Sequence, residues 1–311
     1  MKYKKHITTT LYVITLFFLL VIIAVPTFVA SMFLGERIYQ PQHNSADYGI
    51  ESHPITLTTD DNLALAAWRT FSAVEATHGT VIIVSGLQAP SVTAFFGYAN
   101  MLAQNGWDSL LIEKRARSLS EGREIGFGTT EWLDIKAGMD FLDNDPRAGD
   151  LPIIALGTSA GGAAAIIAGG EIPRLDGIIA ISAYSNFIDL YIDLLPTFNI
   201  PRFVGIASTP FMHLNMGFRL GFDTARNTPV RGIARLGQRP ILLMHSTEDW
   251  QVPFSHFETL RQAAAENNIA LTTFLREGDW HFVCYDAFVS YPSRDIEFSQ
   301  AIIEFLTQFI S

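Results

Sequence analysis

The spacing of apolar residues changes repeatedly along the chain from about residue 53. Runs such as Val81–Val84 and Ile241–Met244 are continuously apolar, which is typical of strands buried on both faces. Between these runs, apolar residues recur every three or four positions, as from Trp132 to Leu142, which indicates helices. Strands that alternate with helices predict an α/β fold with a mainly parallel central sheet and helices on both faces.

The same spacing predicts the order of the elements. A hairpin comes first, with strands at 55–59 and 63–68 around an acid-rich turn. Further strands are predicted at 81–84, 110–112, 153–156, 178–181, 241–244 and 271–275, and helices at 95–102, 132–142, directly after residue 159, 257–265 and 298–309. In such sheets, functional sites lie at the carboxyl ends of the strands.

One segment, about 184–236, is far too long for an ordinary connection. It is rich in apolar residues and contains Pro196, Pro201 and Pro210, which predicts a series of short helices. We expect this insertion to form a helical cap over a pocket at the carboxyl edge of the sheet. Most of its apolar side chains should only pack it onto the body, but Phe187 and Tyr191 are candidates for binding substrate.

The amino-terminal stretch has a different pattern. Lys2, Lys4 and Lys5 precede an uncharged run from Leu11 to Leu34. This run of about 24 residues would form a helix about 36 Å long, enough to cross a bilayer. Positive residues favour the cytoplasmic side, so residues 1–36 are expected to be a cytoplasmic tail and a single transmembrane anchor in the inner membrane. The rest of the chain would then lie outside the cytoplasm, in the periplasm or the extracellular space.

A cleaved signal peptide is the alternative interpretation of this stretch. Its apolar region is normally shorter, and Phe28 is too large for the position two residues before a cut after Ala30. We therefore expect the helix to remain as an anchor in the lipid bilayer. Residues 37–52, which are polar and include Pro41, would form a linker, and residues 53–311 a single folded domain.

Composition narrows the classes of partner and cofactor. The chain has 311 residues, 49% of them hydrophobic, which is enough for a large core. A net charge of -10 disfavours nucleic acid as a partner. Cys284 is the single cysteine, which excludes an internal disulfide and a cysteine-based metal cluster, and we expect it to be buried.

The candidate chemistry begins in the segment 152–165, where a short apolar run, a turn and a small-residue helix follow one another. Gly157 and Gly161 flank Ser159, as a sharp strand-to-helix turn requires. This turn would expose the hydroxyl of Ser159 at the edge of the sheet and direct the amide of Ala160 at a reacting oxygen. Glycine-rich bends are also ordinary packing devices, so the segment alone does not identify a site.

A nucleophilic serine needs a base and a carboxylate that orients the base. Asp249 lies shortly after the predicted strand 241–244, and His281 follows the predicted strand 271–275. The order serine, acid, histidine is the one expected when the serine stands on a turn of this type. Trp280, next to His281, is a further candidate for the wall of the substrate pocket.

Other residues near these positions offer alternatives. Glu248 could be the acid in place of Asp249. His245 ends a buried strand and is expected to be a packed core histidine rather than a base. His213, in the insertion, and His256, on a predicted helix, are interpreted as structural or exposed.

From about residue 53 to the last residue, the chain resembles the α/β-hydrolases. It is most similar to a bacterial serine-hydrolase branch with an amino-terminal membrane anchor and an esterase- or peptidase-like body. Four motifs at predicted strand ends carry the resemblance: Glu113-x-Arg115-x-x-x-x-Ser120-x-Gly122, Gly157-Thr-Ser159-Ala-Gly161, His245-x-x-x-Asp249-x-x-Val252-Pro253 and Gly278-x-x-His281. The spacing to Val252-Pro253 favours Asp249 over Glu248 as the acid.

The resemblance implies the α/β-hydrolase fold and a triad of Ser159, His281 and Asp249, with no metal or organic cofactor. The amides of Leu87 and Ala160 would form the oxyanion hole. The chain departs from the family's usual pattern at four positions: Ser85 replaces a histidine, Thr158 stands where histidine or tyrosine is common, and Glu113 and Ala116 replace aspartate and glycine.

Two classes of function follow from these observations. The first is a membrane-anchored serine hydrolase that acts on small-molecule carboxylic esters or thioesters with an apolar part, with peptidase activity as a variant. The second is a catalytically inactive α/β-hydrolase body that serves as a binding or scaffold module at the membrane. The departure at Ser85 favours the second, and the complete Ser, Asp and His set favours the first.

Overall fold

The computed structural model describes residues 2–37, 42–74, 76–87 and 91–310. An eight-stranded sheet crosses the centre of these ranges, with the strand order β1-β2-β4-β3-β5-β6-β7-β8. β2 pairs antiparallel with β1 and β4, and the other neighbouring strands pair in parallel. The predicted hairpin and the predicted mainly parallel α/β sheet are both confirmed.

The predicted strands and helices are present, with their ends shifted by a few residues. The strands are β1 Ser52–Thr58, β2 Ala64–Thr70, β3 Gly79–Val84, β4 Trp107–Ile112, β5 Ile153–Thr158, β6 Gly177–Ile181, β7 Ile241–Ser246 and β8 Leu271–Arg276. The helices are α1 Lys2–Leu34, α2 Phe96–Gln104, α3 Trp132–Leu142, α4 Ala160–Glu171, α5 Phe187–Leu194, α6 Arg202–Leu220, α7 Pro229–Ala234, α8 Phe254–Glu266 and α9 Ile296–Thr307.

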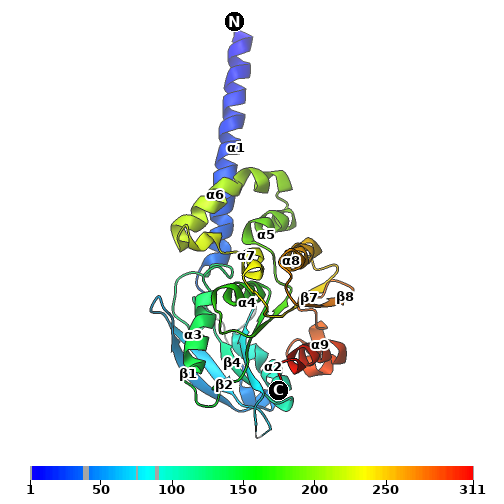
Figure 1. Ribbon diagram of the computed structural model, residues 1–311. Coiled ribbons are helices and arrows are strands. Elements are labelled where there is room, and N and C mark those ends of the chain that lie inside the picture. Colours follow the sequence, from blue (N-terminus) through cyan, green and yellow to red (C-terminus); the bar gives the residue numbers. More distant parts are fainter. Residues whose placement is uncertain (1, 38–41, 75, 88–90, 311) are drawn as a thin grey trace.

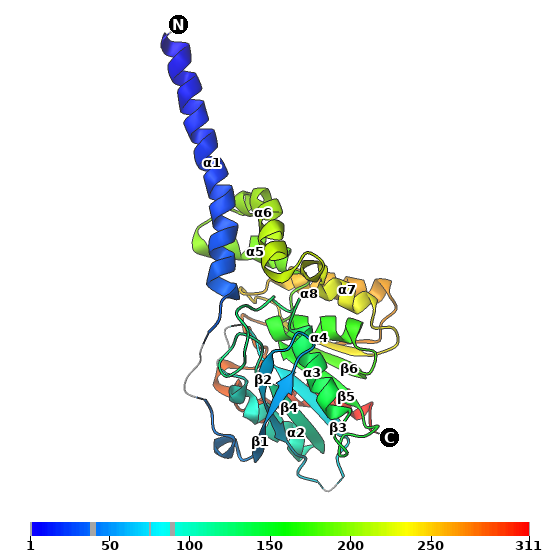
Figure 2. The ribbon, with the colours of Figure 1, turned by 90° about the vertical axis from the view of Figure 1, so that its left-hand side faces the viewer.

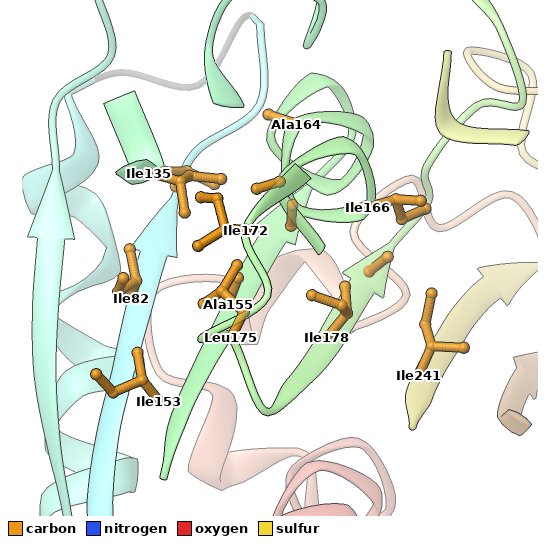
Figure 3. Packing of buried hydrophobic residues seen from close by; sticks show 14 of the residues in the cluster. Ile82, Ile135, Ile153, Ala155, Ala164, Ile166, Ile172, Leu175, Ile178 and Ile241 are labelled. Carbon is orange, nitrogen blue, oxygen red and sulfur yellow. The ribbon is translucent and has the colours of Figure 1, made fainter. Parts of the chain in front are cut away.

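Helices cover both faces of the sheet, so the inner strands are buried on both sides. In β3, Ile82 packs in the core under α3, α4, α7 and α8, while Ile83 packs in the core under α2 and α9. Figure 3 shows the first of these cores, where Ile82, Ala155 and Ile178 from neighbouring strands face Ile135 of α3 and Ile166 of α4. Burial on two faces is the physical reason for the continuously apolar runs.

The first part of the insertion between β6 and β7 forms the predicted helical cap. α5, a short 3₁₀ helix at Leu195–Phe198 and α6 lie above the carboxyl edge of the sheet (Figure 1). The expectation that Pro210 ends a helix is wrong, because α6 continues through it. Pro210 removes one backbone donor, but the preceding turn is supported by the hydroxyls of Ser208 and Thr209, which donate to the carbonyl of Gly205 at 3.0 and 3.1 Å.

The end of the insertion belongs to the body rather than to the cap. α7 packs directly on α4, and the two helices approach closely at a pair of glycines. A Cβ atom on Gly170 of α4 would lie 2.7 Å from the Cα atom of Gly232 of α7. The cap therefore consists of α5, the 3₁₀ helix and α6.

The amino-terminal stretch forms one helix, α1, which projects from the body (Figures 1 and 2). Its segment Thr9–Leu34 is long and apolar enough to cross a membrane. In the predicted linker, Pro41 lies outside the described residues. The following residues include a 3₁₀ helix at Ser45–Tyr48, and Tyr48 is buried against the ring of Tyr291. This part of the linker is thus packed on the body.

Candidate active site

Ser159 stands on a strained turn between β5 and α4. Its backbone φ and ψ are 53° and -118°, a conformation that L-residues rarely adopt. A Cβ atom on Gly161 would lie 2.5 Å from the carbonyl oxygen of Val84, and one on Gly157 would collide with the backbone of Gly161. The two glycines therefore let β3, β5 and α4 come close enough to hold Ser159 in this conformation.

Asp249 and His281 meet at the same edge of the sheet. Asp249 follows β7, His281 follows β8, and the two side chains share a hydrogen bond of 2.8 Å between His281 Nδ1 and Asp249 Oδ2. The second carboxylate oxygen accepts the backbone amides of Gln251 and Val252 at 2.9 and 3.0 Å. These bonds fix the orientation of the carboxylate, which in turn fixes the imidazole ring.

The electrostatic balance at Asp249 favours its ionised form. Burial acts to raise the pKa of this carboxyl group. The hydrogen bond from His281, the charge of that ring and the backbone bond from Val252 outweigh burial and lower the pKa below its ordinary value. A buried acceptor with this charge holds the imidazole Nδ1 protonated and leaves Nε2 as the basic nitrogen.

A cavity of about 310 Å³ lies between the carboxyl edge of the sheet, the cap and the end of α1. Ser159 and His281 both line it, and no hydrogen bond joins them in the described structure. The remaining wall is mainly apolar and aromatic and consists of Val29, Phe33, Gly86, Leu87, Phe127, Ala160, Tyr184, Phe187, Leu190, Tyr191, Leu194, Leu195, Thr197, Phe198, Trp250, Gln251, Val252 and Phe282.

The cavity wall includes two of the three predicted substrate-binding residues. Phe187 and Tyr191, from α5, line it as expected. Trp280 does not, and its ring instead packs edge-on against Tyr285 at 5.2 Å. The loop after β8 directs His281 and Phe282 to the cavity in its place. The prediction for Trp280 was therefore wrong because adjacency in sequence does not set the direction of a side chain in an irregular loop.

The two residues predicted to supply amides to the oxyanion hole, Leu87 and Ala160, line the same cavity as Ser159. Ala160 is the first residue of α4, so its amide is among those without a partner inside the helix. Lys114 supports the loop after β3 that carries Leu87. The Nζ atom of Lys114 donates to the carbonyls of Ser85 and Gly86 at 2.8 and 2.6 Å.

Lys114 is a functional candidate that the sequence reasoning missed. Its side chain is 1% exposed, and burial, together with the nearby charge of Arg117, lowers its pKa to about 8. The nearby carboxylates of Glu131 and Glu113 act in the opposite direction and favour the charged form. A signal was present in the sequence, since a lysine two residues after a buried strand is expected to need acceptors inside the protein.

The alternative histidines and acids are not part of this arrangement. Glu248 is exposed, and its neighbour Asp249 contacts His281. His245 is 1% exposed and its Nε2 bonds to the carbonyl of Val252, as expected of a core histidine. His213 is exposed.

His256 forms a second set of serine, histidine and acid, which links the cap to the body. Its Nδ1 accepts from the backbone amide of Ser185 at 3.2 Å and lies 2.8 Å from the hydroxyl of the same residue. Its Nε2 lies 3.4 Å from a carboxylate oxygen of Asp193 on α5. Ser185 and His256 are buried and neither lines the cavity, so this set has a structural role.

The motif after β4 is a scaffold, as the resemblance implies. Arg115 pairs with Asp134 at 2.7 Å, and Ser120 donates to the carbonyl of Glu113 at 2.6 Å. Ala116 has a φ of 54°, which explains why glycine is usual at this position. Cys284 is buried as expected, and among the described residues no group of three or more His, Cys, Asp or Glu side chains is arranged to hold a metal ion.

Comparisons with known proteins agree with this geometry at the level of the fold. An esterase of Pyrococcus furiosus superimposes with a TM-score of 0.70 at 19% identity, over 90% of this chain and 99% of that chain. The chain has the α/β-hydrolase fold. An α/β-hydrolase from a Penicillium species, GrgF, gives 0.63 at 14% identity over 84% of this chain and 99% of that one.

A peptidase shares the same α/β-hydrolase fold. The acylaminoacyl peptidase of Pyrococcus horikoshii superimposes with a TM-score of 0.62 at 16% identity, over 84% of this chain but only 42% of that chain. No family model matches the sequence, and no curated protein matches it. The α/β-hydrolase fold is therefore established by structure alone, and the strand order, the turn at Ser159 and the cap insertion described above all fit it.

Proposed function

We propose that the chain is a serine hydrolase that cleaves carboxylic esters or thioesters through Ser159, His281 and Asp249. The observation that carries the proposal is the 2.8 Å bond between Asp249 and His281 Nδ1, at the wall of a cavity that Ser159 also lines. Neighbours of the same fold that are esterases, a peptidase and other hydrolases support hydrolytic chemistry in general.

In the proposed reaction, Ser159 Oγ bonds to the carbonyl carbon of the substrate and passes its proton to His281 Nε2. The ionised Asp249 stabilises the imidazolium that results. The amides of Leu87 and Ala160 donate to the oxyanion, and each such donor typically contributes about 3 kcal/mol to lowering the barrier. The carbon–oxygen or carbon–sulfur bond of the leaving group then breaks as His281 returns the proton to it.

Water completes the proposed cycle. His281 takes a proton from water, the hydroxide attacks the acyl carbon, and the acid is released as Ser159 recovers its proton. Ser159 and His281 need to come within hydrogen-bond distance in the complex with substrate, since such bonds often tighten only there. The apolar wall formed by Phe127, Phe187 and Leu190 fits an apolar acyl or alcohol group.

We also propose that α1 is retained as a single-pass anchor in the inner membrane, with the lysine-rich start of the chain in the cytoplasm. The support is that Ala30 and Leu34, near the end of α1, are fully buried in the body. Removal of α1 as a signal peptide would strip this apolar surface from the folded domain. Digestion of the body by protease added outside the inner membrane is the expected result, and protection of the body would refute this topology.

The test of the hydrolase uses the full-length protein in detergent micelles. We expect a fluorophosphonate to label Ser159, and Ser159→Ala to abolish both labelling and hydrolysis of p-nitrophenyl butyrate. Ser185→Ala is the matched control, because Ser185 is a buried serine bonded to a histidine outside the cavity. Undiminished hydrolysis by Ser159→Ala refutes the assignment, and an unlabelled wild-type protein favours the inactive scaffold.

A further inference from the structure

The end of α1 forms part of the wall of the cavity at Ser159. Val29 and Phe33 line this cavity, and both are 6% exposed. The ring of Phe33 lies edge-on to those of Phe127 and Phe198, at centroid distances of 6.3 and 6.4 Å. The helix that is apolar enough to cross a membrane is thus also one side of the candidate substrate pocket.

The cap helix α6 lies along the second half of α1 (Figures 1 and 2). Near its start, Phe203 stacks on Phe18 with ring centroids 6.3 Å apart. Towards its end, the side chain of Asn215 donates to Thr27 Oγ1 at 3.3 Å, and Arg219 donates to Ser31 Oγ at 3.3 Å. The two helices therefore run in the same direction, and α6 accompanies α1 from about position 18 to position 31.

One side of α6 carries large apolar side chains that the body leaves exposed. Phe218 is 79% exposed, and Phe203 and Ile206 are both 59% exposed. Arg202 and Arg219, the two arginines of this helix, form ion pairs with Asp193 and Glu124. Large exposed apolar side chains so close together are unusual on a protein surface in contact with water. We call this surface, made of Phe203, Ile206, Leu214 and Phe218, the α6 face.

The position of the α6 face along α1 indicates what covers it. About 20 helical residues cross a hydrocarbon core of about 30 Å, so a span that starts at Thr9 reaches the far boundary near residue 29. The contacts of α6 with Phe18 and Thr27 lie before this boundary. The contact of Arg219 with Ser31 lies just past it, so the α6 face extends from the distal leaflet, at Phe203, to the boundary between lipid and water, at Phe218.

We propose that the cap is embedded in the bilayer that α1 spans, and that the cavity receives an acyl-chain lipid ester directly from that leaflet. This inference rests on the proposed serine-hydrolase function and adds the substrate class and its route. Phe198 connects the two surfaces, since it lines the cavity, contacts Phe33 of α1 and is 40% exposed. A cavity of about 310 Å³ has room for one acyl chain, so any second chain of the lipid would stay in the membrane.

The first experiment tests the position of the α6 face. A fluorophore is attached to Phe218→Cys in full-length protein reconstituted into phosphatidylcholine and phosphatidylglycerol vesicles, because the native Cys284 is fully buried. Lipids with a doxyl group close to the glycerol end of the acyl chain should quench this fluorophore, because Phe218 lies near the boundary between lipid and water. Asn144→Cys is the control, since Asn144 is exposed in the loop that leads to the amino end of β5, at the opposite edge of the sheet, and should not be quenched.

Two other results would refute the proposal that the cap is embedded in the bilayer. Quenching of the Phe218→Cys label by aqueous iodide but not by doxyl lipids would place the α6 face in water. Protection from both quenchers would show that a second copy or another protein covers it. In either case the proposed hydrolase could still be active, so this experiment tests only the position of the α6 face.

The second experiment tests the route of the substrate with two fluorophosphonates in the same vesicles. One carries a hexadecyl chain and partitions into the bilayer, and the other is short and water-soluble. We expect Phe203→Ser combined with Phe218→Ser to slow labelling of Ser159 by the long probe by about tenfold or more, since two membrane-anchoring rings are lost, and to leave the short probe unaffected.

Substitutions in α1 test its part in the pocket. Val29→Trp fills the cavity and should slow labelling by the long probe by about tenfold more than labelling by the short one. Ile23→Trp, on a part of α1 that is 46% exposed, is the matched control and should change neither rate. Equal effects on both probes would overturn the inference. Failure of both probes to label Ser159 in the wild type would instead refute the proposed function.

Discussion

Replacement of Lys114 by methionine tests how the oxyanion loop is held. The substitution keeps most of the buried stem and removes two hydrogen bonds, of 2.8 and 2.6 Å, to the carbonyls of Ser85 and Gly86. A hydrogen bond to a charged group typically stabilises by about 1.5–3 kcal/mol. The loop that carries Leu87, the proposed oxyanion donor, would therefore lose both of these hydrogen bonds.

The expected kinetic effect is limited by what the amide of Leu87 can contribute. Loss of one oxyanion donor typically lowers kcat by about 100-fold or more, so partial misplacement of that donor should lower kcat by about 10- to 100-fold. KM should change little, because the bond to the oxyanion forms only in the transition state. Hydrolysis of p-nitrophenyl butyrate measures both constants. Lys136→Met, which removes a surface lysine paired with Asp140, is the control and should leave both unchanged.

The pH dependence gives a second readout that a purely structural role would not produce. The pKa of Lys114 is lowered to about 8, so the wild-type ammonium loses its proton as the pH rises through this value and its hydrogen bonds weaken. We expect kcat of the wild type to fall above about pH 8, and this fall to be absent in Lys114→Met.

The charged Lys114 is expected to favour catalysis but to lower the free energy of unfolding. A lysine whose pKa is lowered from 10.5 to about 8 in the folded state costs about 3 kcal/mol at neutral pH, and this cost disappears as the pH rises from about 8 to 10.5. Removal of the charge therefore offsets much of the loss of hydrogen bonding, and the melting temperature should stay near that of the wild type. A folded Lys114→Met protein with unchanged kcat and the same fall above pH 8 would refute the proposed role.

Four further substitutions have defined outcomes. Asp249→Asn should lower kcat by about 10⁴-fold at unchanged folding, while Glu248→Gln, one residue away and exposed, should keep full activity; the reverse pattern would make Glu248 the acid. Gly161→Ala should lower the unfolding free energy by about 1–3 kcal/mol in urea titrations and abolish labelling by fluorophosphonate, because its Cβ atom would meet the carbonyl of Val84 at 2.5 Å. His256→Phe should lower the melting temperature without changing kcat, and a loss of kcat at full stability would contradict its structural role.

The pH dependence of unfolding provides one more check. The pKa of Asp249 is lowered below its ordinary value of 3.8, so the carboxylate stabilises the folded state above about pH 4 and this contribution is lost as the pH falls below that value. Comparison of wild type with Asp249→Asn in urea titrations should therefore show a steeper loss of unfolding free energy in acid for the wild type. Parallel curves would contradict the lowered pKa.

The sheet could be predicted from sequence because its inner strands are buried on both faces. That burial requires continuous apolar runs such as Val81–Val84, and it leaves a pattern in the sequence that few other structures share. The turn at Ser159 was also predictable, since only glycine fits at positions 157 and 161. Asp249 and His281 were found because the carboxyl ends of parallel strands meet at one edge.

The features that the sequence did not predict depend on contacts between distant segments. Hydropathy identified α1 as a possible membrane span, but it contains no information that Val29 and Phe33 would face a cavity formed by residues more than 90 positions away, such as Phe127. Helix continuation at Pro210 is accompanied by hydroxyl bonds in the preceding turn and by packing of α6 against α1, neither of which the local sequence pattern reports. The direction of Trp280 is set by its contact with Tyr285 in an irregular loop.

The contribution of Val29 and Phe33 has a consequence for where the protein can work. A surface enzyme joined to its anchor by an independent stalk keeps its specificity when a protease severs the stalk. A cut within residues 42–51 of this chain would instead detach the body from two side chains of its own pocket. If the proposed function holds, shedding would change which acyl chains the released body accepts, and attachment to the membrane would set the selectivity of the enzyme as well as its location.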